Sequence, residues 1–234
     1  MRASPPERRC LRSGARPPAM RQQFLDLRGR LRGQPAQHVL DVGIRIVPPG
    51  VTDSSRFLKV AETLRAAHRK AYDIIKAGPG DGPVGMTLAM HDFQPASPDA
   101  VSATTLARRM MEDLFLENCR GDDFIGVQTY TRLRIGADGQ RVPPGPDVES
   151  TQMGWEFWPQ ALEATIRNAW AVTHGVPILV TENGYEGDDD QRRIAYTETA
   201  LSGVLACLAD GIDVRGYTCW SLLDNFEPIF LSCP

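Results

Sequence analysis

Hydrophobic residues follow two alternating patterns along the chain: short continuous runs, and longer stretches with a helical period. The runs predict buried β-strands over residues 39–47, 84–90, 123–131, 177–183 and 214–223. The stretches between them predict helices over residues 55–77, 99–117, 158–172 and 192–209. Strands that alternate with single helices are typical of parallel βαβ units, so the pattern predicts an α/β protein.

Two of the predicted helices carry a clear apolar stripe. In the helix over 55–77 the stripe consists of Phe57, Ala61, Leu64, His68, Ala71 and Ile75. In the helix over 192–209 it consists of Ile194, Leu201, Val204, Leu205 and Leu208. Each stripe predicts one buried helix face. Because His68 lies within its stripe, we expect it to pack and form a hydrogen bond rather than to act in catalysis.

Two architectures are built from such units, a doubly wound open sheet and a (β/α)8 TIM barrel. No glycine-rich phosphate loop follows the first predicted strand, which disfavours the common nucleotide-binding sheets. Polar residues instead lie at the C-terminal ends of several strands: Gln128 and Tyr130, Glu182 and Asn183, and residues 220–227. Barrel enzymes build their active sites at that face, so the pattern favours a barrel.

Composition and charge narrow the class of protein without assigning a function. Hydrophobic residues make up 42% and charged residues 24% of the chain, as in soluble globular proteins. No apolar run is long enough to cross a bilayer, and the Arg-rich start has no apolar signal segment. We therefore expect a cytoplasmic protein without a membrane partner.

Charge and cysteine content argue against two further kinds of partner. Residues 1–33 hold nine arginines and two acidic residues, a charge of +7 that leaves −10 on the rest of the chain. These arginines alternate with Pro, Gly and Ala rather than with aromatic residues, so we expect no nucleic-acid partner. The five cysteines are scattered and form no metal-binding motif, so we expect no metal and no cofactor.

Glu182 ends the apolar run ILVTENG at residues 178–184, where a carboxylate is costly unless it is paired or used. One interpretation is structural: Glu182 caps the following turn or pairs with Arg192 or Arg193. The other is a catalytic carboxylate held by rigid strand backbone. Tyr130 offers a phenolic donor, and Trp220 offers a flat face for a sugar ring. With Glu227 as an acceptor for hydroxyl groups, these residues indicate a carbohydrate site.

Three strings closely resemble glycoside hydrolase family 1, the β-glucosidase family: TENG at 181–184, DFIGVQTYT at 123–131 and DGIDVRGYTCWSLLDNFE at 210–227. The stretch from Pro48 to Gly80 also resembles the loop and helix that follow the family's fourth strand. The resemblance runs from about residue 47 to 227. It implies an incomplete (β/α)8 barrel that holds about strands 4–8, over residues 39–234.

The resemblance implies retaining hydrolysis of β-glucosides or related β-glycosides, including oligosaccharides, with Glu182 as the nucleophile that forms a covalent glycosyl-enzyme. Tyr130 matches the tyrosine that contacts the nucleophile, and Gln128 replaces the family's usual asparagine. Trp220 matches the tryptophan beneath the sugar, and Glu227 the acid that binds its far hydroxyl groups. His91 and Asp92 are expected to line the aglycone side.

The family's acid/base glutamate, in an Asn-Glu-Pro motif, is missing from the sequence. Its nearest counterpart is Gly33-Gln34-Pro35, which would place Gln34 at that position and restrict hydrolysis to substrates with good leaving groups. Residues 1–46 otherwise match the family poorly, and residues 1–38 form a segment of their own. We expect this basic, Pro/Gly/Arg-rich segment to be disordered or to lie outside the family, through truncation or a shifted reading frame.

Several alternatives stay open from the sequence. The chain is either an active glycosidase, impaired by the missing acid, or a non-catalytic, vestigial sugar-binding protein. A 6-phospho-β-glycosidase is disfavoured, because Glu227 would repel a phosphate group. An incomplete barrel exposes strand edges, so we also expect self-association.

Overall fold

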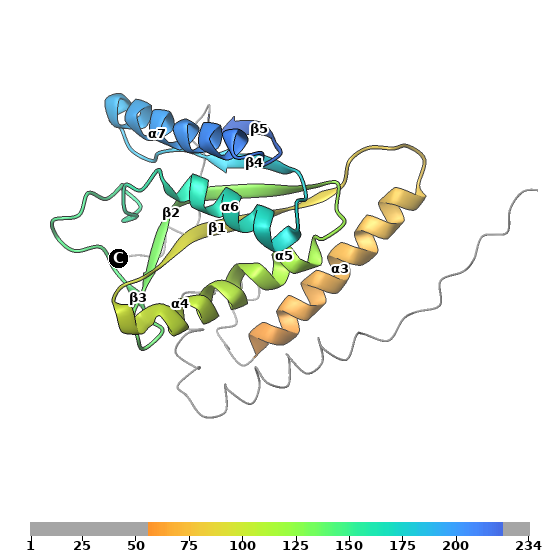
Figure 1. Ribbon diagram of the computed structural model, residues 1–234, viewed down its shortest axis with the longest axis horizontal. Coiled ribbons are helices and arrows are strands. Elements are labelled where there is room, and N and C mark those ends of the chain that lie inside the picture. Colours follow the sequence, from red (N-terminus) through yellow and green to blue (C-terminus); the bar gives the residue numbers. More distant parts are fainter. Residues whose placement is uncertain (1–55, 222–234) are drawn as a thin grey trace, which may run out of the picture. The chain divides into compact units, whose positions relative to one another are not determined.

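Four of the predicted strands form a parallel sheet in the order β1-β2-β4-β5 (Figure 1). In the computed structural model, which describes residues 56–221, their bounds are β1 Gly85–Pro95, β2 Phe124–Ile135, β4 Ile178–Asn183 and β5 Val214–Cys219. A two-residue strand, β3 (Arg141–Val142), pairs antiparallel with the end of β2. The segment between β2 and α6, for which the sequence predicts neither a strand nor a helix up to residue 157, therefore contains a short strand. The predicted strand over 39–47 lies outside the described residues.

The predicted helices are present with shifted ends. They are α3 (Phe57–Ala77), α6 (Ala161–Thr173) and α7 (Asp190–Ala209). The predicted helix over 99–117 consists of a short turn η2 (Pro98–Ala100), α4 (Val101–Arg108), a π-helical turn η3 (Arg109–Asp113) and α5 (Leu114–Asn118). A π turn inserts extra backbone into a helix and is frequent at functional sites.

Helices cover one face of the sheet, and the core lies between the two layers. Figure 1 shows α6 lying across β1 and β2, against which it packs, and α7 beside α6. Alternate strand residues face this layer and are fully buried, among them Ile125, Val127, Ile178 and Val180. The intervening residues from Gln128 onward in β2 are only partly buried, so they belong to the opposite face.

The stripe predicted for α7 is wrong in all but one of its residues. Val204 is buried, but Ile194, Leu201, Leu205 and Leu208 are 37–65% exposed. The buried face instead consists of Tyr196, Ala200, Gly203, Val204 and Cys207. A Cβ atom on Gly203 would lie 2.8 Å from Cβ of Glu163 on α6. The two helices pack so closely that their contact takes small residues rather than the largest apolar ones.

The stripe predicted for α3 is also partly wrong. Ala61 is buried, whereas Leu64 and Ile75 are more than half exposed. The helix contacts the body of the protein through polar side chains. His68 Nε2 lies 2.7 Å from Oδ2 of the buried Asp122, and Arg69 pairs with the same carboxylate. The hydrogen-bonded role predicted for His68 is present.

All described residues fall in one unit of the chain. The predicted boundary between residues 1–38 and 39–234 stays a prediction, because residues 1–55 lie outside the described part. No helix within residues 56–221 is long and apolar enough to span a membrane.

Candidate active site

The middle of β2 and the C-terminal end of β4 bring three of the predicted site residues together. Gln128 on β2 is the register partner of Glu182 on β4, and Tyr130 follows on the same face of β2. The parallel ladder shifts register between Val127 and Gln128, immediately before this pair. Such bulges bend a strand locally and re-aim its side chains, which is why they often lie beside active sites.

Both carboxylate oxygens of Glu182 accept a hydrogen bond from β2. The Gln128 side chain donates from Nε2 to Oε1 over 2.7 Å, and the Tyr130 hydroxyl donates to Oε2, also over 2.7 Å. These are charge-assisted bonds when Glu182 is ionised, and together they fix the orientation of the carboxylate.

The structural interpretation of Glu182 finds no support among its expected partners. Arg192 forms a two-pronged ion pair with Glu149, and Arg193 pairs with Asp190 in the first turn of α7. The cap of α7 is the carboxylate of Asp189, which accepts from the backbone N–H groups of Gln191 and Arg192. Within residues 56–221, Glu182 therefore receives its side-chain hydrogen bonds from two neutral donors, Gln128 and Tyr130.

Aromatic side chains flank these residues. Trp220 is 41% exposed just after β5, and its backbone N–H donates to the carbonyl of Asn183 over 2.8 Å. This approach explains Gly184, because a Cβ atom there would lie 2.0 Å from the Trp220 carbonyl oxygen. The Trp155 ring lies 5.5 Å from that of Tyr130, centroid to centroid. The sequence reading missed Trp155, since a loop residue carries no periodic signal.

A second polar network occupies the neighbouring ends of β1 and β2. Arg132 donates to Glu156 and Gln94 over 2.5 and 2.8 Å, and its guanidinium lies 3.7 Å from the centroid of the Trp158 ring. Trp158 Nε1 in turn donates to Asp92 over 3.1 Å. Asp92 thus has a place in this network, and its aglycone role stays a prediction.

His91, by contrast, is bound to a helix of the covering layer. Its backbone N–H donates to Oε1 of Glu112 over 2.6 Å, and its Nδ1 lies 3.8 Å from the same oxygen. Glu112 belongs to the π turn and is 1% exposed. The aglycone role predicted for His91 also stays a prediction.

The structure also gathers His68, Cys119 and Asp122, whose ligand atoms lie within 4.8 Å of one another. The Arg69 guanidinium lies in the same cluster, with Nη2 2.6 Å from His68 Nε2. Burial raises the pKa of the Cys119 thiol to about 11 and, with Arg69 nearby, lowers the pKa of His68. A protonated thiol beside an arginine does not suit a cation, so we interpret the cluster as the anchor of α3.

Two predicted site residues, Gln34 and Glu227, lie outside the described residues. Their places relative to Glu182 stay predictions.

Comparison with known proteins decides the family. The model of glycosyl hydrolase family 1 matches residues 123–230, a range that includes both strands of the Glu182 site. Residues 123–230 belong to glycosyl hydrolase family 1. A β-galactosidase of Sulfolobus acidocaldarius is similar, with 31% identity over 192 residues, 69% of this chain and 39% of the relative.

Solved structures place the fold in the same family. A β-glycosidase, BGL167, superposes with a TM-score of 0.67 at 50% identity, over 72% of this chain and 40% of the other. A hyperthermophilic β-glucosidase mutant superposes with a TM-score of 0.70 at 27% identity, over 83% and 47%. The chain spans about two fifths to one half of these proteins' lengths. The predicted (β/α)8 barrel is confirmed as a partial barrel of family 1 type.

Proposed function

We propose that Glu182 is the nucleophile of a retaining β-glycosidase site. The observation that carries the proposal is the double anchoring of its carboxylate, at the C-terminal end of β4, by Gln128 and Tyr130 on the neighbouring parallel strand β2. Neither donor is a cation, so within residues 56–221 the carboxylate is oriented without a salt bridge that would weaken it as a nucleophile. Membership of residues 123–230 in glycosyl hydrolase family 1 supports this assignment.

In the proposed first step, a carboxylate oxygen of Glu182 attacks the anomeric carbon of a β-glycoside. The bond from that carbon to the aglycone oxygen breaks, and the aglycone leaves with the electron pair. In the second step a water oxygen attacks the same carbon, the bond from that carbon to the Glu182 oxygen breaks and releases the carboxylate, and the excess proton of the water passes to the solvent. The Gln128 and Tyr130 donors hold the carboxylate in line for both steps.

The proposed substrates are β-glucosides or related β-glycosides. The similar proteins described above are named as β-galactosidase, β-glycosidase and β-glucosidase. Trp220 is exposed beside Glu182's strand, where its ring can carry the apolar face of a sugar. Glu227, from the resemblance, would bind the sugar's hydroxyl groups.

The missing Asn-Glu-Pro motif limits the proposed reaction to aglycones that leave without protonation. With Gln34 at the acid/base position, the leaving oxygen receives no proton, because an amide is not an acid at neutral pH. The rival function is a vestigial site that binds a sugar and does not react with it; the missing motif is the observation in its favour.

A 2-deoxy-2-fluoro-β-glucoside with a dinitrophenyl leaving group separates the two, since it needs a nucleophile and no acid. We expect peptide mass spectrometry to find one covalent sugar on the peptide that contains Glu182. The Glu182→Gln variant should take up none, and an exposed control, Glu198→Gln, should be labelled as the wild type is. A wild-type chain that binds glucose but is never labelled would establish the rival function.

A further inference from the structure

A buried polar network lies directly behind Glu182. It consists of Asn183 on β4, Tyr196 on α7 and Tyr217 on β5. Asn183 is 0% and Tyr196 is 1% exposed. Tyr217 donates from its hydroxyl to Oδ1 of Asn183 over 2.9 Å, and Asn183 Nδ2 donates to the carbonyl of Thr129 over 2.7 Å. A single amide side chain therefore joins three strands.

The network lies where the regular ladder is interrupted on both sides of β4. The β2–β4 ladder shifts register between Val127 and Gln128, and the β4–β5 ladder shifts between Val180 and Asn183. Backbone groups at such irregularities need other partners. The Asn183 side chain supplies one for Thr129, and the Asn183 carbonyl receives the N–H of Trp220.

Tyr196 connects this network to the other side of the site. Its hydroxyl donates to the backbone carbonyl of Tyr130 over 2.7 Å and receives Asn183 Nδ2 at 3.3 Å. Tyr130 is the residue whose own hydroxyl holds Glu182. Burial raises the pKa of the Tyr196 hydroxyl, so it stays protonated and remains a donor. The backbone carbonyl of Tyr130 and the side chain of Asn183, the residue after Glu182, are thus held by the same hydroxyl.

We infer that Tyr196, Asn183 and Tyr217 are positioning residues, which set the distance between Tyr130 and Glu182 and so orient the carboxylate for attack. The inference rests on the proposed role of Glu182. It assigns to α7, a helix of the outer layer, a part in the chemistry at the Glu182 carboxylate. The arrangement contains no cation, because all its donors are neutral; Asn183 and Tyr196 are buried, and Tyr217 is partly buried.

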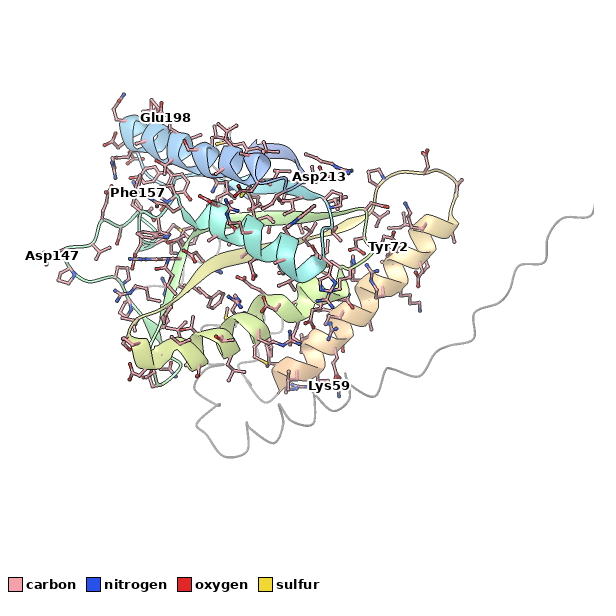
Figure 2. All side chains as sticks on the ribbon, in the orientation of Figure 1. Lys59, Tyr72, Asp147, Phe157, Glu198 and Asp213 are labelled. Atoms are coloured by element: carbon pink, nitrogen blue, oxygen red, sulfur yellow. The ribbon has the colours of Figure 1, made fainter. Side chains whose placement is uncertain are left out.

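Packing and positioning by Tyr196 can be separated experimentally. Its ring packs edge-on against Phe157 at 5.6 Å and lies 6.3 Å from that of Tyr185, centroid to centroid. These contacts remain in Tyr196→Phe, which removes only the hydroxyl. Tyr72→Phe is the matched control, because the Tyr72 hydroxyl also donates to a backbone carbonyl, that of Gly121, over 3.1 Å. Figure 2 shows Tyr72 on α3 and Phe157 at opposite ends of the described part.

The test measures the rate constant of labelling at saturation and the half-saturating concentration of the fluoroglucoside. In Tyr196→Phe and Tyr217→Phe we expect the rate constant to fall by about tenfold, the equivalent of one lost hydrogen bond in the reacting geometry. The half-saturating concentration should stay within about twofold, since the sugar's own contacts are unchanged. Tyr72→Phe should match the wild type in both. Unchanged rate constants in folded Tyr196→Phe and Tyr217→Phe would overturn the inference.

A second measurement does not depend on labelling. Hydrogen exchange of the segments 128–131 and 181–184 should speed up in Tyr196→Phe and not in Tyr72→Phe, while exchange in α6 stays the same. Equal exchange in all three proteins overturns the inference. If the wild type takes up no label, the proposed function of Glu182 fails, and the exchange comparison still decides whether Tyr196 holds the two strand ends.

Discussion

At the scale of residues, the chemistry of the site depends on how Glu182 is held. Two neutral donors orient it, whereas the nearby arginines are occupied by other carboxylates. A guanidinium in place of either donor, 2.7 Å from a Glu182 oxygen, would stabilise the carboxylate and make it a poorer nucleophile. Gln128 performs this role with one more methylene than the family's usual asparagine, and its amide still reaches Oε1.

Removal of the Tyr130 hydroxyl should slow the attack more than it weakens binding. A hydrogen bond to a charged group contributes about 1.5–3 kcal/mol, so Tyr130→Phe should lower the labelling rate constant by roughly 10- to 100-fold. Stopped incubations with the fluoroglucoside, analysed by intact mass, give the rate. A variant that is labelled as fast as the wild type would show that the 2.7 Å contact does not orient Glu182.

Glu112 should make stability depend on pH. Burial is the main cause of its raised pKa, Asp113 adds to the effect, and the hydrogen bond and charge of His91 oppose it. Its Oε2 has no hydrogen-bond partner among the described residues. The folded state therefore binds the proton more tightly than the unfolded state. The free energy of unfolding should fall as the pH rises from the usual carboxyl range to the raised value, by at most about 1.4 kcal/mol per pH unit.

Glu112→Gln tests this dependence, because the amide oxygen can still accept from the His91 N–H. Urea unfolding between pH 4 and about pH 8 should show a flatter profile for this variant and at least wild-type stability at neutral pH. Glu198→Gln, at an exposed position of α7, should keep the wild-type slope. Parallel profiles for all three proteins would contradict the assignment.

At the scale of elements, burial rather than hydrophobicity decides which helix residues contribute to stability. Ile166 on α6 is 0% exposed in the main core cluster, whereas Leu205 on α7 is 65% exposed. The sequence reading placed Leu205 in a buried stripe, because side-chain type alone does not reveal that α6 and α7 meet through Gly203.

Truncation of these two residues should give very different results. Ile166→Ala removes buried methylene groups and leaves a cavity, so it should lower the free energy of unfolding by about 2–5 kcal/mol. Leu205→Ala should change it by less than about 0.5 kcal/mol. Chemical denaturation monitored by tryptophan fluorescence measures both. A large loss in Leu205→Ala would mean that its face is covered in solution.

At the scale of the whole molecule, the described sheet ends in the outer strands β1 and β5. The helix α7 carries an exposed row formed by Ile194, Leu201, Leu205 and Leu208, and packs against α6 through other residues. Such a row is an apolar surface of the kind that promotes association.

We expect the chain to self-associate, and the α7 row to contribute. Sedimentation velocity should show a mass above that of a monomer, which increases with concentration. Replacement of Leu201 and Leu205 by glutamate should shift the distribution toward monomer, and Glu198→Gln, on the same helix, should not. A monodisperse wild-type monomer with a cooperative melt would contradict the expectation.

The sequence by itself determined the order and type of the elements and the chemistry expected at their ends. Continuous apolar runs and helical periods are local properties, so they located β1, β2, β4, β5 and the helices to within a few residues. The motif around Glu182 likewise indicated a nucleophile, because strand ends of parallel units meet at one face.

Only the tertiary structure decided which atoms meet. It placed Gln128 and Tyr130 on the two oxygens of Glu182 and put Tyr196 behind them. It also placed at the surface several leucines that the pattern assigns to the core. The physical reason is the same in each case: contacts between distant segments depend on register shifts and on the closeness of helix packing, neither of which a local pattern encodes.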